Sequence, residues 1–394
     1  MIQKILKGSL LSAVAMFAII GCGSDDSTTV KEEITITPYQ RIATVPGTKA
    51  DIEKIALKIS DYVVNTDEKA VLGFPSNWVI AGANPHANET YEGNADLIPI
   101  PVDTGKEVYK SRVIEFCNGP YATQAINTGQ QHGSALPCEV AVHSDGTNVY
   151  VDMLNADAIF TIFFPGIEDP DGKLKSMAES VKSEIRRMVM ASLENETGVT
   201  EVTEDLGPKF TKDELSKIKD EDIYLVTKYQ SAEGKVFTKA DAKKLAQTII
   251  EKMGTDEQNA DTFVEGLSSG SKWRSARPDP IAIPGVFVTE ACSPTYAKMA
   301  TRLGAEYITA LPCEITTYLD RTDDTNKTLS ISILSPKFMF ENMFKGAVEK
   351  AVRDTNLSQE EVNKYQTLAD TVLGDLNKIV NEAVENSGLN LIKK

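Results

Sequence analysis

The chain has 394 residues, and its 41 lysine and arginine side chains against 57 aspartate and glutamate side chains give a net charge of −16. This acidic balance argues against nucleic acid as a partner, because phosphates are bound by clusters of lysine and arginine. It also argues against electrostatic docking on anionic lipid. The length suits two or three domains rather than one.

The first 21 residues have the pattern of a lipoprotein signal peptide. Two lysines precede an apolar stretch from Leu10 to Ile20, which is too short to span a bilayer. The stretch ends in Ile19-Ile20-Gly21-Cys22, which resembles the bacterial lipobox. The resemblance implies cleavage before Cys22 and attachment of diacylglycerol to its sulfur. The alternative is an ordinary secretory signal followed by an incidental cysteine.

Residues 22–32 are polar and predict a flexible tether. Loss of the signal peptide removes two lysines and changes the net charge to −18. No other segment approaches the ~20 apolar residues that a transmembrane helix needs. We therefore expect a lipid-anchored protein of the cell envelope. Gly23 after the cysteine favours the outer membrane, with the protein facing the periplasm.

The second feature is an internal repeat. Three pairs of segments match in the same order: 37–51 with 227–241, 117–139 with 292–314, and 149–164 with 329–344. The first pair shares seven of its fifteen positions at an offset of 190 residues. The second pair closes with the identical run Ala-Leu-Pro-Cys-Glu. Three collinear matches indicate a duplicated and fused gene.

Each copy predicts the same order of elements. Alternating or β-branched residues predict strands at 33–37 and 222–226. Thr48 and Thr238 are placed as N-caps of helices with apolar residues at helical spacing. Further strands, a short helix and a hairpin at Asp145-Gly146 complete a β-α-β-α-β-β pattern followed by a helix. This pattern is typical of the α+β class, with an antiparallel or mixed sheet and helices on one face.

The domain boundaries follow from the repeat and from the segments outside it. Residues 174–195 predict a helix, and the acidic stretch after it predicts a connection between the copies. The expected parts are a signal peptide at 1–21, a flexible tether at 22–32, a first repeat domain at 33–166, a helical linker at 167–220, a second repeat domain at 221–346 and a C-terminal helical segment at 347–394.

The second pair of segments carries a family resemblance. Phe116-Cys117-Asn118-Gly119-Pro120, Leu136-Pro137-Cys138-Glu139 and Asp152-Met153-Leu154-Asn155-Ala156 resemble the domain-of-unknown-function 302 family. Ala291-Cys292-Ser293-Pro294 and Leu311-Pro312-Cys313-Glu314 look similar. The resemblance implies a compact α+β domain, related in shape to the TATA-binding-protein-like fold, that can pair into dimers. Two fused copies could then form an intramolecular pseudo-dimer. The family implies no reaction.

Four cysteines remain besides Cys22, two in each copy. In an oxidising periplasm the first expectation is disulfides, and four cysteines allow three connectivities. A single-copy ancestor would most simply join its own two cysteines, which gives Cys117–Cys138 and Cys292–Cys313. Each such bond would stabilise the fold by roughly 3 kcal/mol through chain entropy.

Two other roles for the cysteines stay open. Cys138 and Cys313 could be reactive thiols, although the glutamate after each would raise the pKa of the thiol. The cysteines could also bind a metal with His132, although no close C-x-x-C pair is present. His86, His132 and His143 are themselves expected to be exposed. We expect no metal and no cofactor.

Four further residues are candidates for ligand binding. Tyr121 and Tyr296 could line a pocket, although an aromatic side chain at a helix start usually packs on the sheet. Glu139 and Glu314 could form a pair of acids across the interface of the copies, although a carboxylate at a strand start is usually solvated.

The function predicted from these features is binding of a small ligand or envelope protein at the junction between the copies. No residue is assigned a catalytic role. The alternative is a thiol-redox or sulfur-handling enzyme that uses Cys138 and Cys313, and a third possibility is a purely structural surface lipoprotein.

Overall fold

The computed structural model describes most of the chain beyond the expected tether. The described residues are 35–64, 78–80, 111–136, 138–254, 267, 273–275, 278–301, 303–310, 313–355 and 357–394. The expected signal peptide, the lipobox cysteine Cys22 and His86 lie outside the described residues.

The first of two large sheets has six strands in the order β3-β4-β5-β6-β2-β7. Each recorded strand pairing in this sheet is antiparallel. Its strands are β2 (Tyr39–Pro46), β3 (Trp78–Ile80), β4 (Ser111–Asn118), β5 (Cys138–Ser144), β6 (Asn148–Leu154) and β7 (Thr200–Leu206). The β5–β6 connection is the hairpin that Asp145-Gly146 predicts, and Gly146 has the positive φ of 96° that such a turn requires.

The second sheet also has six antiparallel strands, in the corresponding order β10-β11-β12-β13-β9-β14. Its strands are β9 (Tyr224–Ser231), β10 (Ile281–Ile283), β11 (Val286–Ala291), β12 (Cys313–Leu319), β13 (Thr328–Leu334) and β14 (Leu391–Lys393). A two-stranded sheet joins β1 (Thr35–Ile36) to β8 (Phe210–Thr211). Antiparallel sheets combined with helices confirm the predicted α+β class.

Helices α1 (Ile52–Val64) and α9 (Lys239–Met253) begin where the sequence predicted helix N-caps. Thr48 and Thr238 each form a capping box, with Asp51 and Asp241 respectively, at the start of a helical segment. α1 then buries Ile52, Ile55, Ile59 and other apolar residues at helical spacing in the core of the first sheet. α9 buries Leu245, Ile249 and their neighbours in the same way.

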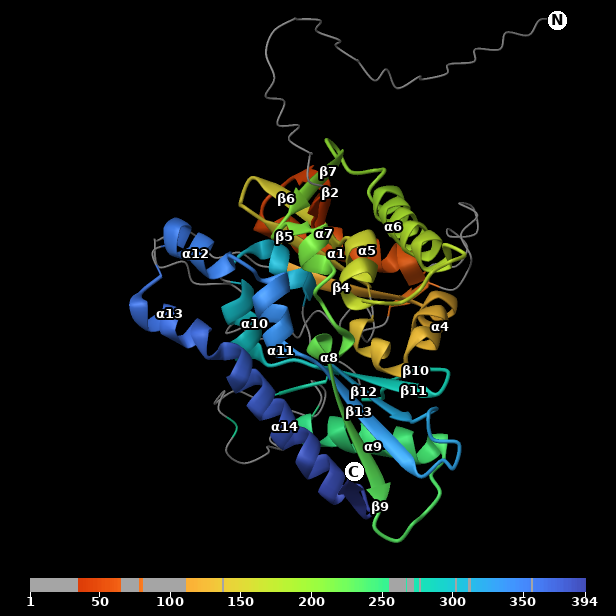
Figure 1. The fold of residues 1–394 in the computed structure, drawn as a ribbon. Helices are drawn as coiled ribbons and strands as arrows, with labels where there is room; N and C mark the ends of the chain where they lie inside the picture. The colour runs from red at the N-terminus through yellow and green to blue at the C-terminus, as the bar shows by residue number, and fades with distance from the viewer. Residues whose placement is uncertain are drawn as a thin grey trace, which may run out of the picture. The chain divides into compact units, whose positions relative to one another are not determined.

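The remaining helical segments flank the sheets (Figure 1). They are η1 (Lys49–Asp51), α1 (Ile52–Val64), α4 (Gly119–Thr128), η2 (Gln130–Ala135), α5 (Ala156–Phe163), α6 (Lys173–Ser192), α7 (Lys212–Leu215), α8 (Asp220–Ile223), α9 (Lys239–Met253), α10 (Pro294–Thr301), η4 (Ala305–Ala310), α11 (Pro336–Phe338), the π-helix η5 (Met339–Met343), α12 (Ala347–Thr355), α13 (Gln359–Gln366) and α14 (Leu368–Asn386). Within the described part of the chain, no helix is long and apolar enough to cross a membrane.

The long helices α6 and α14 belong to the packing of the two sheets. The segment 167–220, expected as a helical linker, contains α6, which packs on α1 and α5, and β7, which pairs with β2. The segment 347–394 contains α14, which packs against α9, and β14, which pairs with β9. We therefore call the first sheet with α1, α4, α5 and α6 the first half, and the second sheet with α9 to α14 the second half.

The two halves contact each other through corresponding segments. η2 of the first half packs on β11, β12 and β13, while η4 of the second half packs on β4, β5 and β6. Gly133 in η2 comes so close that an added Cβ would lie 3.0 Å from side-chain carbons of Thr316 and Val286. Across the same junction, Tyr39 donates to the carbonyl of Met343 at 3.1 Å, and Tyr224 donates to that of Phe163 at 2.7 Å.

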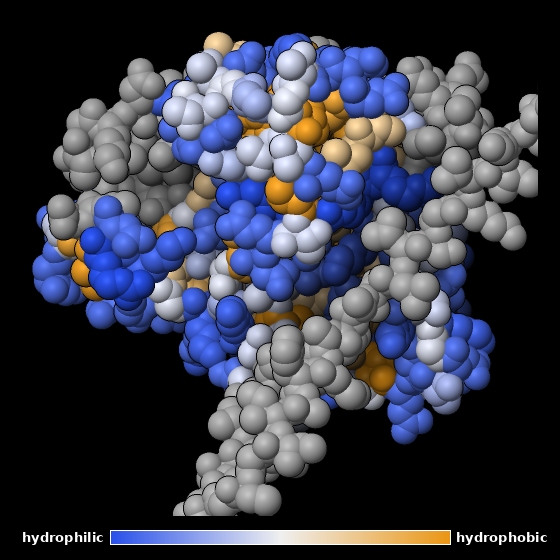
Figure 2. Space-filling model, turned by 90° about the horizontal axis from the view of Figure 1, so that it is seen from above, coloured by the Kyte–Doolittle hydropathy of each residue, from blue (hydrophilic) through white to orange (hydrophobic). Residues whose placement is uncertain are grey.

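Charged and polar side chains cover most of the face seen in Figure 2, with small hydrophobic areas between them. The apolar side chains lie mainly between the sheets, their helices and the junction.

Candidate functional site

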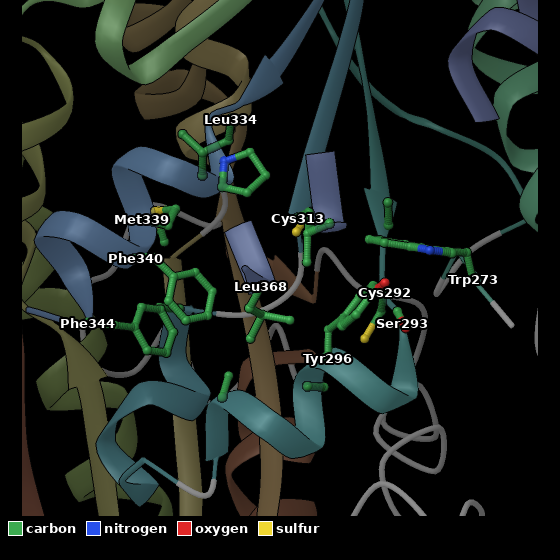
Figure 3. A pocket seen from close by; sticks show the side chains of 16 residues that line it. Trp273, Cys292, Ser293, Tyr296, Cys313, Leu334, Met339, Phe340, Phe344 and Leu368 are labelled. Atoms are coloured by element: carbon green, nitrogen blue, oxygen red, sulfur yellow. The ribbon is translucent and has the colours of Figure 1, made fainter. Parts of the chain in front are cut away.

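The second half contains an apolar cavity of about 60 Å³, which we call the second pocket. Figure 3 shows Trp273, Cys292 and Tyr296 on one side of it and Phe340 and Phe344 on the other. It is lined by Trp273, Ala291, Cys292, Ser293, Tyr296, Ala297, Ala300, Ala310, Cys313, Leu334, Pro336, Met339, Phe340, Phe344, Leu368 and Val372. Its wall is therefore made of rings, methyl groups and thiols.

A buried carboxylate holds the two polar aromatic side chains of this pocket. Asp375 of α14 is 0 % exposed, and its Oδ2 accepts from the Trp273 indole at 3.3 Å and from the Tyr296 hydroxyl at 2.9 Å. The two rings lie 5.7 Å apart. Because both polar atoms donate to Asp375, the ring faces remain for contact with whatever enters the cavity.

The first half has the same arrangement around a smaller cavity of about 20 Å³, the first pocket. Glu184 of α6 accepts from the Trp78 indole at 2.6 Å and from the Tyr121 hydroxyl at 2.7 Å. Trp78, Cys117, Tyr121 and Cys138 all line this cavity. The structure thus brings the predicted tyrosines and the cysteines of each half to one place.

The expected disulfides are not formed, which corrects the prediction from the sequence. Cys117, Cys138, Cys292 and Cys313 all carry thiols. The strand register pairs Cys138 with Phe116 and Cys313 with Ala291, so the two cysteines of each half are one position out of register and do not lie directly opposite each other. Both cysteines of a half nevertheless line the same pocket.

Burial keeps two of the thiols protonated. The pKa of Cys138 is raised to about 12 by burial and by the neighbouring Cys117 and Glu139. The pKa of Cys313 is raised to about 12 by burial and by Cys292 and Glu314. A thiolate is the reactive form of cysteine, so the protonated thiols of Cys138 and Cys313 suit apolar contact with a ligand better than nucleophilic attack.

Four glutamates form a second cluster, at the junction of the halves. The register places Glu115 opposite Glu139 in the first sheet and Glu290 opposite Glu314 in the second. None of the four is more than 7 % exposed. The sequence predicted an acid pair of Glu139 and Glu314, and the structure adds Glu115 and Glu290. We call these four residues the glutamate cluster.

The glutamate cluster has an unusual proton affinity. Burial raises the pKa of Glu115 well above its usual value, and the charge of Glu290 raises it further, followed by the charges of Glu139 and Glu314. Burial also raises the pKa of Glu314, with smaller effects from Glu290 and Glu139. Neighbouring carboxylates cannot all ionise in a low dielectric, so the cluster keeps its protons to a higher pH than free glutamates do.

A small cavity of about 40 Å³ adjoins this cluster. Its wall contains corresponding residues of the two halves, namely Ser134 and Thr309, Ala135 and Ala310, Glu139 and Glu314, Leu154 and Leu334, Ile159 and Met339, and Phe163 and Met343. The cavity lies at the junction where the sequence predicted a ligand site. It has room for a few water molecules rather than for a large ligand.

Two histidines expected to be exposed are buried. His132 is 0 % exposed, contacts Thr128 at 2.6 Å and Asp220 at 3.0 Å, and lies between the rings of Phe164 and Tyr224. His143 is 5 % exposed and contacts Asp152 at 2.7 Å. Each histidine has polar partners that compensate its burial. Among the described residues, no group of three or more His, Cys, Asp or Glu is arranged to hold a metal ion.

The sequence did not predict Glu115 and Glu290 of the glutamate cluster, nor Trp78, Glu184, Trp273 and Asp375 of the two pockets. A signal for Glu115 and Glu290 was present, because each lies two residues before the first cysteine of its half. A signal for Trp78 and Trp273 was that they are the only tryptophans of the chain, one in each half. The number of residues between each tryptophan and the first cysteine of its half differs, so an alignment of the two copies does not match the tryptophans.

Comparison with known proteins gives a partial match. Residues 102–192 match the family model described as "Domain of unknown function DUF302". The crystal structure of an uncharacterized conserved DUF302 protein from Bacillus stearothermophilus is 14% identical, covers 39% of this chain and 96% of its own, and has a TM-score of 0.24. The di-domain ARO/CYC BexL from the BE-7585A biosynthetic pathway is 10% identical, covers 88% of this chain and 98% of its own, and has a TM-score of 0.18. No curated protein matches the chain.

The family match covers β4, α4, η2, β5, β6, α5 and α6, and so includes Tyr121 and Glu184 of the first pocket. It does not assign an activity, since the family is one of unknown function.

Proposed function

We propose that this protein binds a small apolar ligand, or the apolar group of a larger one, in the second pocket, with the first pocket as a weaker counterpart. The arrangement of a tryptophan and a tyrosine on one carboxylate beside an apolar cavity carries the proposal, because it occurs in both halves. Binding pockets of this kind combine apolar walls with a few fixed polar groups. In the second pocket, Asp375 orients Trp273 and Tyr296 before any ligand arrives.

The size of the cavity limits the ligand. Apolar cavities stay dry and take up small apolar molecules, and one of about 150 Å³ holds benzene. The second pocket is smaller, at about 60 Å³. A short aliphatic chain therefore fits directly, and a single ring fits if Met339, a flexible side chain in the wall, moves aside.

Protonated thiols support binding rather than thiol chemistry. The alternative function is a thiol-redox or sulfur-handling enzyme that uses Cys138 and Cys313. Their raised pKa values leave few thiolates at neutral pH, and a nucleophilic cysteine needs the opposite shift. No observation on the described residues favours this alternative.

The proposal includes a duplicated architecture. We propose that the two halves derive from one domain and pair as a dimer within the chain. The corresponding strand orders of the two sheets support this, as do the hydrogen bonds that Tyr39 and Tyr224 donate across the junction. The carboxylates at the two pockets, Glu184 of α6 and Asp375 of α14, each accept from the tryptophan and the tyrosine of their own half.

The proposal also includes an anchored location. A lipid on Cys22 would hold the protein at the cell envelope, most simply at the outer membrane, and the acidic tether would separate the halves from anionic lipid. Membrane fractionation of cells that produce the protein or its Cys22→Ser variant tests this part. The variant is expected in the soluble fraction, and a variant that stays with the membrane would rule out this anchor.

The two tryptophans give a direct test of binding, since each pocket contains one. Trp78→Phe leaves Trp273 as the reporter of the second pocket, and Trp273→Phe leaves Trp78 as the reporter of the first. We expect 1-butanol and benzene to change the emission of Trp273 saturably and that of Trp78 weakly. Native mass spectrometry of protein purified from its host then identifies the natural ligand.

Filling each pocket provides the matched control. Ala297→Leu narrows the second pocket, and Ala122→Leu narrows the first at the corresponding position. Ala297→Leu should abolish the response of Trp273, whereas Ala122→Leu should leave it unchanged. Thermal unfolding of both variants checks that they fold. Equal responses in both variants, or none in the parent, would overturn the proposal.

A further inference from the structure

A separate groove of about 900 Å³ opens along the first half. Its floor is formed by the start of β2 and the turn before α5, and its walls by α5, α6 and α7. Lining side chains include Thr37, Gln40, Asn155, Phe160 and Phe164. This volume is in the range of pockets that hold a complete small molecule.

Three polar oxygens at the floor of the groove have no hydrogen-bond partner. They are Oγ1 of Thr37, Oε1 of Gln40 and Oδ1 of Asn155. The side chains are only 4, 3 and 7 % exposed. A buried polar atom without a partner destabilises a fold, and most such atoms in proteins are paired. Three of them around one groove are therefore a sign of a missing ligand.

The hydrogen bonds of the Gln40 and Asn155 side-chain amides determine which of their atoms remain available to a ligand. Gln40 donates its Nε2 to Asp205 at 3.1 Å, and Asn155 donates its Nδ2 to the carbonyl of Thr37 at 3.0 Å. The NH₂ group of each amide thus already has a hydrogen bond, and only the two carbonyl oxygens have none. These oxygens can only accept, so a ligand must supply donors.

The position that corresponds to Asn155 in the second half is Ser335, and its side chain has a purely structural bond. Ser335 precedes α11 as Asn155 precedes α5, and its backbone N–H binds the carbonyl of Ile223 as that of Asn155 binds the carbonyl of Pro38. Ser335 caps its helix by accepting from the amide of Phe338 at 3.2 Å. Asn155 makes no such cap bond. The Asn155 side chain therefore lacks the stabilising cap bond that Ser335 makes, which agrees with a role of Asn155 in binding a ligand.

The charges of the groove favour a neutral ligand. Asp157 pairs with Lys182 at 2.8 Å, and Glu179 lies 4.0 Å from Lys175. Asp205 accepts from Gln40, and Asp169 accepts from the backbone amide of Lys175 at 3.0 Å. Each carboxylate that lines the groove thus has a partner, so an incoming cation would find none uncommitted.

We propose that this groove binds a neutral saccharide, whose hydroxyl groups donate to Thr37, Gln40 and Asn155. The Phe160 ring, half-buried in the wall and stacked on Phe164 at 4.9 Å, provides an apolar surface for the C–H face of the sugar ring. The groove shares the Phe160 side chain with the first pocket, but none of its three acceptor residues lines either aromatic pocket, so the site does not depend on the function proposed for them.

The test measures binding of glucose, maltose and N-acetylglucosamine by saturation-transfer NMR and calorimetry. We expect at least one of these sugars to bind the parent chain. Thr37→Val removes one acceptor with little change of shape, and Asn155→Ser introduces the residue of the second half. Each variant should bind roughly five- to tenfold more weakly, the loss expected for one hydrogen bond.

Stability separates loss of the site from loss of the fold. Thr37→Val should melt no lower than the parent, because the hydroxyl that it removes has no partner in the fold. Asn155→Ser also removes the bond from Nδ2 to the carbonyl of Thr37, but its hydroxyl can cap α5 as Ser335 caps α11, so its melting temperature should stay near that of the parent. Ser335→Ala, the matched control, should lower the melting temperature by removing a cap while leaving sugar affinity unchanged. Absence of sugar binding, equal affinity in all variants, or preference for a cation such as putrescine would overturn the proposal.

Discussion

Glu115 of the first sheet and Glu290 of the second interact across the junction of the halves, because the charge of Glu290 adds to burial in raising the pKa of Glu115. The two residues are 7 % and 2 % exposed, so water does not stabilise their charged forms. Ionising both would place two negative charges close together in a buried place, so protonation of one of them favours the contact between the halves.

Alkaline pH should weaken the fold through the glutamate cluster. The pKa values of Glu115 and Glu314 lie above their usual 4.5, so the folded chain keeps these protons to higher pH than the unfolded chain does. The free energy of unfolding should be level below about pH 4.5 and fall as pH rises through the folded pKa values. The slope should be at most about 1.4 kcal/mol per pH unit for each retained proton.

Denaturant unfolding at a series of pH values measures this dependence. Glu115→Gln and Glu314→Gln cannot ionise, so the double variant should lose most of the slope and be the more stable protein at pH 8. Glu385→Gln, at an exposed position of α14, should leave the slope unchanged. If the double variant kept the parent slope, the cluster would not hold these protons.

Four thiols should be found in the unfolded protein. The titration uses a Cys22→Ser chain, prepared without reductant. In the native state, Cys138 and Cys313 should react about 1000-fold more slowly than a thiol of pKa 9, because their pKa values of about 12 leave that much less thiolate. Their rates should rise with pH. Fewer than four thiols after unfolding would show that disulfides form in solution.

The sequence predicted the helix N-caps correctly, but it aligned β9 of the second half wrongly with β2 of the first. The capping boxes at Thr48 and Thr238 depend on residues three apart, so the sequence contains all that defines them. The match that pairs Tyr39 with Tyr229 is different. In the sheets, Tyr39 pairs with Leu154 and Tyr224 pairs with Leu334, so Tyr224 is the true counterpart. A longer loop between β9 and α9 shifts the register and makes the other match accidental.

Long-range relations were the part that the sequence could not supply. The duplication suggested a disulfide between Cys117 and Cys138, but the strand register, which pairs Cys138 with Phe116 instead, is set by the whole sheet. The binding of Trp273 by Asp375 joins residues 102 positions apart. No local pattern relates such residues, which is why Tyr296 was predicted for a pocket and its carboxylate partner was missed.

Removing the carboxylate of the second pocket should lower the free energy of unfolding more than removing the carboxylate of the first. Asp375→Ala leaves the Trp273 indole and the Tyr296 hydroxyl without their acceptor in a fully buried place, and should lower the free energy of unfolding by roughly 2–4 kcal/mol. Glu184 is only half-buried, so water can replace it and Glu184→Ala should cost about 1 kcal/mol. Denaturant unfolding compares the two, and equal losses would contradict the role of burial.

The closeness of η2 to the second sheet should make Gly133 intolerant of a side chain. In Gly133→Ala the new Cβ would lie 3.0 Å from carbons of Thr316 and Val286, so η2 must move and the bond of Ser134 to Thr316, now 2.7 Å, must lengthen. We expect a loss of about 1–3 kcal/mol in the free energy of unfolding. Gly119→Ala is the control, since nothing lies within 4 Å of its added Cβ. A Gly133→Ala chain as stable as the Gly119→Ala chain would mean that the halves are less closely packed than the structure has them.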